Sequence, residues 1–200
     1  MKILVVASRN KGKIAEINRL IDAAKLEIEL RSVAEFDLPD VEETGASFEE
    51  NALLKARTIA RATGHPAIAD DSGLAVDALN GAPGIYSARW SGIHGDDGAN
   101  ISKLLSDINE VPAEKRTGRF VAVIALALPS GKEMTTRGEL PGSIRFEPAG
   151  SNGFGYDPIF QPEGDTRTLA EMAPEEKDAI SHRARALREL APKIGSFLEA

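Results

Sequence analysis

The chain of 200 residues has no cysteine, only three histidines and few aromatic residues, which make up 5% of the total. The lack of cysteine excludes disulfides and thiolate metal sites, so the ligands of any metal must be mainly oxygen atoms. Oxygen ligands favour Mg²⁺, with Mn²⁺ as a substitute, over structural zinc.

An excess of basic residues and a long apolar segment are also missing. The 24 Lys and Arg residues face 31 Asp and Glu, a net charge of -7, which argues against a general nucleic-acid-binding protein. The apolar run at residues 3–7 is too short for a signal sequence or a membrane span. We therefore expect a cytoplasmic protein without nucleic-acid or membrane partners, folded as one domain over residues 1–200.

The hydrophobic pattern predicts an α/β fold with a mixed sheet. Residues 3–7 form a β-branched run typical of a strand buried on both faces, and helical spacing follows directly. Ser47 and Glu50 have the spacing of a capping box, and Gly64 is expected to end that helix. Further strands are expected over residues 119–128, 133–140 and 142–146.

Two adjacent carboxylates, Asp70 and Asp71, follow an apolar run and precede Ser72 and Gly73. We expect them where a strand ends in a turn, a setting that suits a hard divalent cation. Since neighbouring side chains leave a strand on opposite faces, only one of the two is expected to reach a shared site. The alternative is a helix cap or turn pair that points into water.

The polar turn of residues 8–13 lies between the first strand and the first helix. Amide groups and the positive end of the helix dipole converge at such a turn, so it can bind phosphate. It is no Walker A motif, because Ala7 and Ile14 stand where that motif needs glycine and serine or threonine. An ordinary solvated basic turn is the alternative interpretation.

Four other groups of residues could carry chemistry, each with a plainer alternative. Lys55 could reach a phosphate, or extend along the edge of the core. Glu42 and Glu43 could add carboxylates to a metal site, or form an exposed acidic loop. The glycine-flanked aromatics of residues 153–158 could form a platform for a ligand or fill the core. His182 could act as a base or only as a hydrogen-bonding group, near Lys177 and Arg183.

Six segments, taken in order, resemble the inosine/xanthosine triphosphate pyrophosphatase family, the Ham1-like hydrolases. They are residues 8–13, 48–56, 69–74, 84–89, 153–158 and 180–183. The resemblance implies an elongated mixed β-sheet flanked by helices, with two lobes, a central substrate cleft and a homodimer. It also implies Mg²⁺-dependent hydrolysis of purine nucleoside triphosphates (ITP, dITP and XTP) to the monophosphate and pyrophosphate. A Maf-like pyrophosphatase and a non-catalytic nucleotide sensor are the alternatives.

The resemblance also implies roles for individual residues. Asp71 is expected to be the general base and a metal ligand, with Glu42 as the second metal carboxylate and its neighbour Glu43 left open. The triphosphate is expected on Ser8, Arg9, Asn10, Lys11, Gly12, Lys13 and Lys55, with Ser72 also touching the substrate. Base recognition is expected from Phe154, Gly155, Tyr156, Asp157, Lys177, His182 and Arg183.

Overall fold

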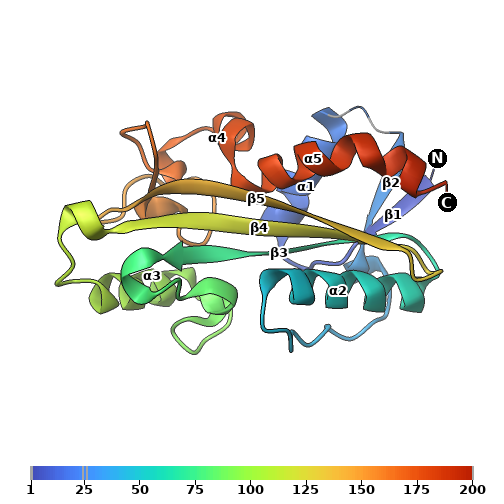
Figure 1. Cartoon of the computed structure of the whole chain (residues 1–200), viewed down its shortest axis with the longest axis horizontal. Coiled ribbons are helices and arrows are strands. Elements are labelled where there is room, and N and C mark those ends of the chain that lie inside the picture. The colour runs from blue at the N-terminus through green and yellow to red at the C-terminus, as the bar shows by residue number, and fades with distance from the viewer. Residues whose placement is uncertain (1, 24, 26, 200) are drawn as a thin grey trace. The chain divides into compact units, whose positions relative to one another are not determined.

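The computed structural model describes residues 2–23, 25 and 27–199, and they form an α/β fold built on a six-stranded sheet (Figure 1). The strand order is β2-β1-β3-β4-β5-β6. β1 runs parallel to β2 and β3, whereas β5 and β6 are antiparallel, so the predicted mixed sheet is confirmed. The strands are β1 (Lys2–Val6), β2 (Ile28–Ser32), β3 (Ala67–Val76), β4 (Thr117–Ala127), β5 (Glu133–Ile144) and β6 (Phe160–Pro162). The α-helices are α1 (Lys11–Ala23), α2 (Phe48–Thr63), α3 (Asp97–Asp107), α4 (Pro174–Ile180) and α5 (His182–Phe197).

The chain divides into two compact units. The first consists of the chain up to Asp71, residues Ala122–Gly138 and the chain from Arg183 onward. The second consists of Ser72–Val121 and Glu139–His182. The single two-lobed domain expected over residues 1–200 stays a prediction.

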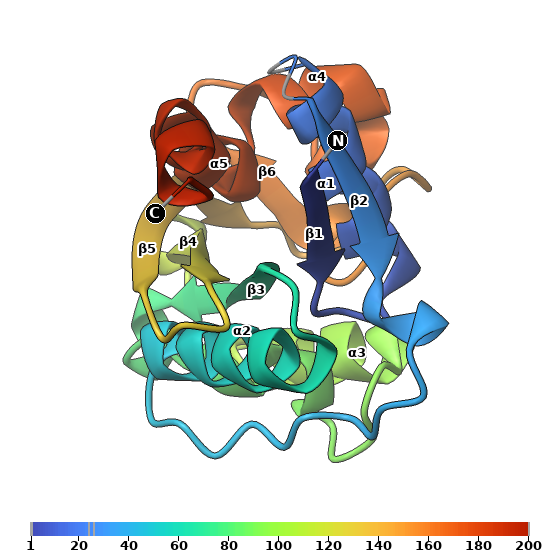
Figure 2. The ribbon, with the colours of Figure 1, turned by 90° about the vertical axis from the view of Figure 1, so that its right-hand side faces the viewer.

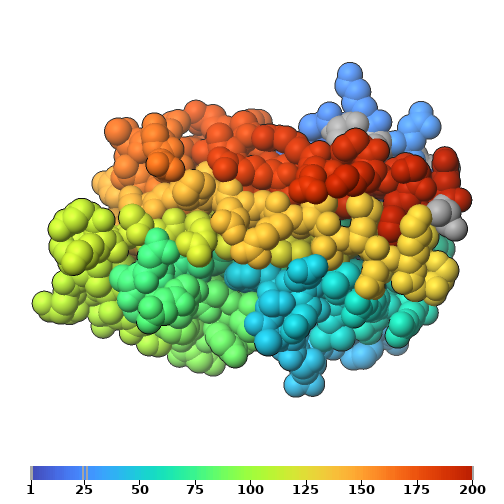
Figure 3. All heavy atoms as spheres, in the orientation of Figure 1, coloured from blue at the N-terminus to red at the C-terminus, as the bar shows by residue number. Residues whose placement is uncertain are grey.

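In the first unit, helices cover both faces of the sheet (Figure 2). Leu4, Val6 and Ile68 pack with side chains of α1 and α5, whereas the alternate positions Val5 and Ala69 pack with α2. This alternation is the two-residue period of a strand buried on both sides. Helix α5 lies along β5 (Figure 3), where the Thr136 hydroxyl donates to the carbonyl of Ala186 at 2.8 Å.

The second unit has a core of its own, formed by strand residues such as Leu74 and Phe120 and by Leu104 of α3. This unit also contains a short 3-10 helix (Gly84–Arg89), which is one of the six segments that resemble the family. Among the described residues, no helix is both long enough and apolar enough to span a membrane.

Capping residues set the ends of α2 much as predicted. The Ser47 hydroxyl accepts a hydrogen bond from the Glu50 amide, and Gly64 adopts a left-handed conformation at the C-cap. The second half of the predicted capping box is wrong, because the Glu50 carboxylate accepts from the Ala46 amide at 2.7 Å instead. The helix therefore holds the loop that precedes it.

Two strand predictions are wrong in their bounds. Residues 133–140 and 142–146 were expected as separate strands, but β5 runs from Glu133 to Ile144 through Pro141. Proline is compatible with a strand where its missing N–H is not needed by a neighbour. Asp70 and Asp71 were expected at a strand end, but they lie in the middle of β3, which continues to Val76.

Candidate functional site

The turn that follows β1 is organised as the amino terminus of α1. The Asn10 side chain accepts a hydrogen bond from the Lys13 amide at 3.1 Å, and Ser8 Oγ accepts from the Asn10 amide at 3.2 Å. Asn10 is thus an N-cap, a position at which asparagine satisfies an amide that has no partner within the helix. This geometry confirms the predicted strand-to-helix turn, and it directs the positive end of the α1 dipole toward residues 8–13.

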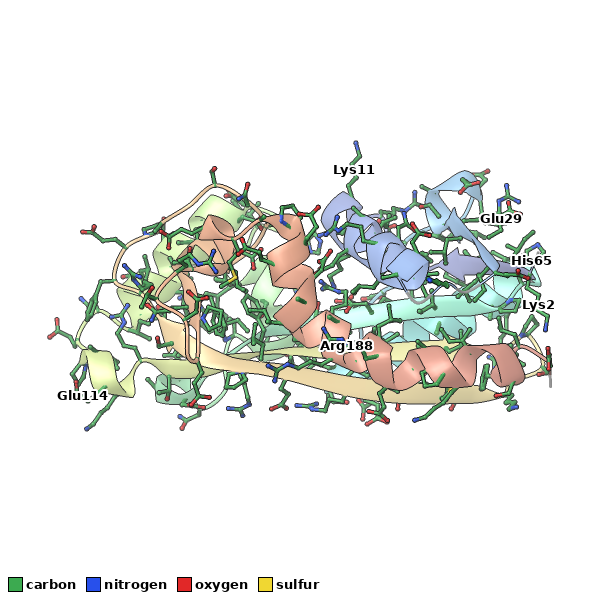
Figure 4. The ribbon with its side chains drawn as sticks, turned by 90° about the horizontal axis from the view of Figure 1, so that it is seen from above. Lys2, Lys11, Glu29, His65, Glu114 and Arg188 are labelled. Atoms are coloured by element: carbon green, nitrogen blue, oxygen red, sulfur yellow. The ribbon has the colours of Figure 1, made fainter. Side chains whose placement is uncertain are left out.

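The basic side chains of this turn differ in their surroundings. Arg9 donates to Asp40 and to the carbonyl of Leu38, both at 2.6 Å, which ties the turn to the loop before α2. Lys11 is exposed and points away from α1 (Figure 4). Lys13 is largely covered and its Nζ lies 2.7 Å from Asp70. Lys13 is therefore the lysine of this turn that the fold itself holds in place.

Asp70 belongs to a buried network of charges that joins three elements. Its carboxylate, which is fully buried, accepts from Arg183 Nε at 3.1 Å and contacts Lys13, while Arg183 also pairs with Glu16 of α1. Burial alone would raise the pKa of Asp70, but the charges of Arg183 and Lys13 outweigh it and hold that pKa far below its usual range. Asp70 is therefore charged at neutral pH and connects β3 with α1 and α5.

Asp71 faces the other side of β3 and forms a second group. Lys55 of α2 lies 3.1 Å from Asp71 Oδ1 and 2.6 Å from Glu43 Oε1. Burial raises the pKa of Asp71 despite the opposing charges of Lys55 and Lys13. Burial would lower the pKa of Lys55, but Asp71 and Glu43 outweigh it, so that pKa is raised and the ammonium stays charged.

The second carboxylate beside Lys55, after Asp71, belongs to Glu43 and not to its neighbour Glu42, which was expected there. Glu43 is half-buried against Lys55, whereas Glu42 is exposed. The loop that carries both is fixed from α2, because the Gly45 amide donates to Asn51 Oδ1 at 2.8 Å. A side chain at Gly45 would meet Asn51 Oδ1 at 2.7 Å, so a residue larger than glycine requires this loop to move.

The Asp71 group fits a magnesium ion that is shared with a ligand. Asp71 Oδ2 is buried and accepts no hydrogen bond from the described residues, so it is available as a metal ligand. Within residues 2–23, 25 and 27–199, no three His, Asp or Glu side chains converge as a ready-made metal site. Mg²⁺ does not require three, since it keeps several waters and usually takes one or two carboxylates together with substrate phosphates.

In the second unit, residues Phe154, Asp157 and Lys177 form a compact group. Asp157 Oδ2 accepts from Lys177 Nζ at 2.6 Å and from the Phe154 amide at 2.9 Å. The Lys177 ammonium also lies 4.7 Å from the centre of the Phe154 ring. Gly153 is required here, because a Cβ would meet Asp157 Oδ2 at 2.0 Å. A half-buried aromatic face thus lies beside a cation whose position is fixed.

Tyr156 and His182 are both buried, which for Tyr156 favours the core-filling alternative. The Tyr156 hydroxyl donates to the carbonyl of Ser87 at 2.9 Å. Burial, with the negative charges of Asp97 and Asp107, raises the pKa of Tyr156, so the hydroxyl keeps its proton. The His182 ring stacks on Phe120 with centroids 4.8 Å apart.

The predicted site residues therefore fall into distinct groups. In the first unit Lys13 joins Asp70, whereas Lys55 joins Asp71 and Glu43. Arg183 was expected to read the base, but it is buried between Asp70 and Glu16, which favours an anchoring role. The predicted substrate contact Ser72 directly follows Asp71 in β3.

Sequence reasoning missed Glu16 and did not assign a role to Asn51. Glu16 lies 167 residues from its partner Arg183, and no local spacing reveals such a pair. Asn51 lies four residues before Lys55 in α2. The sequence signal for the role of Asn51 is Gly45, a glycine six residues earlier whose amide donates a hydrogen bond to Asn51 Oδ1.

Comparisons with known proteins agree with one another over nearly the whole chain. The profile of the Ham1 family matches residues 4–193. A protein of Streptomyces avermitilis named dITP/XTP pyrophosphatase is 54% identical over 199 residues, which cover 99% of this chain and 100% of that protein. The crystal structure of a Mycobacterium abscessus protein described as nucleoside-triphosphatase / dITP/XTP pyrophosphatase is 54% identical, covers 96% of this chain and 100% of its own, and has a TM-score of 0.77. A HAM1 protein from Coxiella burnetii is 44% identical, covers 98% of this chain and 100% of its own, and has a TM-score of 0.88.

Proposed function

Because the chain belongs to the Ham1 family, we propose that it hydrolyses the triphosphates of deaminated purines, ITP, dITP and XTP. The products would be the nucleoside monophosphate and pyrophosphate, and the reaction would remove altered purines from the nucleotide pool. The observation that carries the proposal is the 54% identity, over 99% of the chain, to a protein named dITP/XTP pyrophosphatase. The pairing of a buried aspartate with a buried lysine in the first unit supports the same chemistry.

Asp71 is the general base in this proposal. Its Oδ2 is buried and accepts no hydrogen bond from the described residues, so this oxygen is open to a water molecule. Asp71 orients a water and takes one of its protons as the water oxygen bonds to the α-phosphorus. The bond from that phosphorus to the bridging oxygen breaks, and pyrophosphate leaves with the electron pair.

Positive groups of the first unit balance the charge of the triphosphate. Lys13 and Lys55 are each held by carboxylates, and the amino terminus of α1 adds a positive partial charge. Asp71 and Glu43, with Glu42 as the exposed neighbour, are the residues that would hold Mg²⁺ or Mn²⁺. When bound, the ion draws negative charge from the phosphate oxygens. The lysines keep those oxygens in place while the bond breaks.

Base selectivity is assigned to the group of Phe154, Asp157 and Lys177 in the second unit. The Phe154 ring offers a face for stacking, and Lys177 offers a donor near that face. Hypoxanthine and xanthine carry an oxygen at C6, which accepts a hydrogen bond, whereas adenine carries an amino group there. A buried donor that meets an amino group is left without a partner, and sites of this kind discriminate by up to about 10⁴-fold.

We also propose that the protein works as a cytoplasmic homodimer, as the family resemblance implies. Light scattering of the purified protein in solution tests the assembly, and a mass equal to that of one chain would contradict it.

The test of the function is a chromatographic product assay with ITP, dITP, XTP, GTP, ATP and dTTP in the presence of Mg²⁺. We expect pyrophosphate from the first three, and a fall in rate of at least about 10²-fold in Asp71→Asn. Asp77→Asn is the matched control, because Asp77 is an exposed aspartate paired with Arg119 at 2.9 Å. If the wild-type protein releases no pyrophosphate from ITP, dITP or XTP, the function is wrong. If Asp71→Asn keeps full activity, the role of Asp71 is wrong.

A further inference from the structure

The loop of residues 153–157 is fixed from within by one carboxylate. Asp157 accepts from the Phe154 amide and from Lys177, which closes the loop on itself. Gly153 and Gly155 both have positive φ, at +76° and +61°. Glycine reaches these angles without strain but also leaves them easily, so the loop needs further contacts to stay in one conformation.

A second carboxylate fixes the same loop from outside. Asp97 Oδ2 accepts from the Gly155 amide at 2.7 Å, a short charge-assisted hydrogen bond. The peptide that donates it links Phe154 to Gly155, so the bond acts on the backbone adjacent to Phe154. The next residue, Tyr156, is held by the carbonyl of Ser87. Ser87 and Asp97 therefore accept hydrogen bonds from two consecutive residues of the loop, Tyr156 and Gly155.

The place of Asp97 in its helix is separable from this contact. Asp97 is the first residue of α3, and the N-cap role belongs to its neighbour Asp96, whose carboxylate accepts from the Ala99 amide at 2.9 Å. Asp97 is exposed, so its substitution does not open a cavity in the core. Of the two adjacent aspartates, Asp96 caps the helix and Asp97 binds the loop.

We propose that Asp97 is a positioning residue that sets purine selectivity by holding the Gly155 peptide, and through it the Phe154 ring beside Lys177. This inference rests on the proposed function. Asp97 itself need not contact the substrate. When the bond is lost, the peptide can rotate and the ring no longer keeps one position relative to Lys177, so the site binds the preferred base less well and discriminates less. The chemical step, which depends on Asp71 and the lysines of the first unit, is unaffected.

The experiment compares Asp97→Ala, Asp97→Asn and Asp96→Ala with the wild type, using kcat and KM for ITP, XTP, GTP and ATP. In Asp97→Ala we expect KM for ITP to rise about 5- to 20-fold with kcat changed less than about 2-fold, and the preference for ITP over ATP to fall by a similar factor. Asp97→Asn keeps a side-chain oxygen that can accept from Gly155, so it should stay close to the wild type. Asp96→Ala removes the helix cap and should lower thermal stability without changing KM.

Hydrogen exchange of the Gly155 amide gives a readout that does not depend on activity. The amide should be protected in the wild type and in Asp97→Asn, and should exchange faster in Asp97→Ala. Unchanged KM and selectivity in Asp97→Ala, or the same changes in Asp96→Ala, would overturn the inference. A wild-type enzyme that hydrolyses none of these nucleotides would instead contradict the function on which the inference rests, and circular dichroism separates both outcomes from a failure to fold.

Discussion

Replacing Asp70 by asparagine should destabilise the protein strongly, although the two side chains have almost the same shape. Asp70 is fully buried and is contacted by Lys13 at 2.7 Å and by Arg183 at 3.1 Å. Asparagine removes the negative charge and leaves two cations with Glu16 as the remaining carboxylate of the network. Removing one partner of a buried ion pair costs about 3–5 kcal/mol. Since the asparagine oxygen can still accept one hydrogen bond, we expect about 3 kcal/mol, at the lower end.

The assay is thermal unfolding followed by circular dichroism, with Asp77→Asn as the control. A loss of about 3 kcal/mol corresponds to a fall of about 6–12 °C in Tm for a chain of this size. Asp77 pairs with Arg119 at 2.9 Å in an exposed setting, so the same substitution there should change stability by no more than about 1 kcal/mol. Similar Tm values for the two variants would refute the view that Asp70 anchors the network.

The pH dependence of this difference has a definite sign. The pKa of Asp70 is depressed in the folded protein, so its stabilisation is present above the unfolded pKa, about 4, and is lost as the pH falls toward the folded value. The Tm gap between wild type and Asp70→Asn should therefore be constant from about pH 5 to about pH 8 and narrow only below about pH 4. A gap that closes between about pH 6 and pH 8 would point to a different titrating group.

Three further results are expected. Asn51→Ala should raise the Mg²⁺ concentration needed for half-maximal activity, because the loop bearing Glu43 loses the hydrogen bond from Gly45 to Asn51. Glu49→Ala, on the exposed side of the same helix, should leave that concentration unchanged, and a titration of the rate with Mg²⁺ distinguishes the two variants. Gly153→Ala should raise KM for ITP more than Gly131→Ala does. Both glycines have positive φ, but only at Gly153 would a Cβ meet a neighbouring carboxylate, and equal KM values for the two variants would contradict this. Removing Mg²⁺ with EDTA should abolish pyrophosphate release, and adding Mg²⁺ or Mn²⁺ should restore it; persistent activity without metal would exclude the proposed cofactor.

Local patterns in the sequence were sufficient to predict much of the fold. The β-branched run before residue 8 predicted β1, and Ser47 and Gly64 predicted the two ends of α2, because caps are set by residues within one turn of the helix. The extent of β3 was not predicted. Asp70, Asp71 and Gly73 interrupt the apolar pattern, and only the contacts made across the fold allow charged side chains in the middle of a buried strand.

The candidate site could be predicted only in part, for the same reason. The alternation of side chains along a strand predicted that Asp70 and Asp71 would separate, and the structure confirms it. The partner of each carboxylate depends on tertiary packing. Arg183 follows His182 at the start of α5 and was grouped with it, yet it belongs with Glu16 and Asp70. Glu42 and Glu43 are neighbours, and their sequence alone could not say which one meets Lys55.

Asp70 and Asp71 lie on opposite faces of β3, so the site depends on the register of that strand. Inserting or deleting one residue between Gly64 and Asp70 would turn each carboxylate to the other face. Asp71 would then face the cations of the α1 and α5 side, and its pairing with Lys55 would be lost. Every side chain could be retained and the site would still be lost. Changes in chain length during evolution should therefore be found in the loops that follow β3, whereas the short connection that enters it keeps its length.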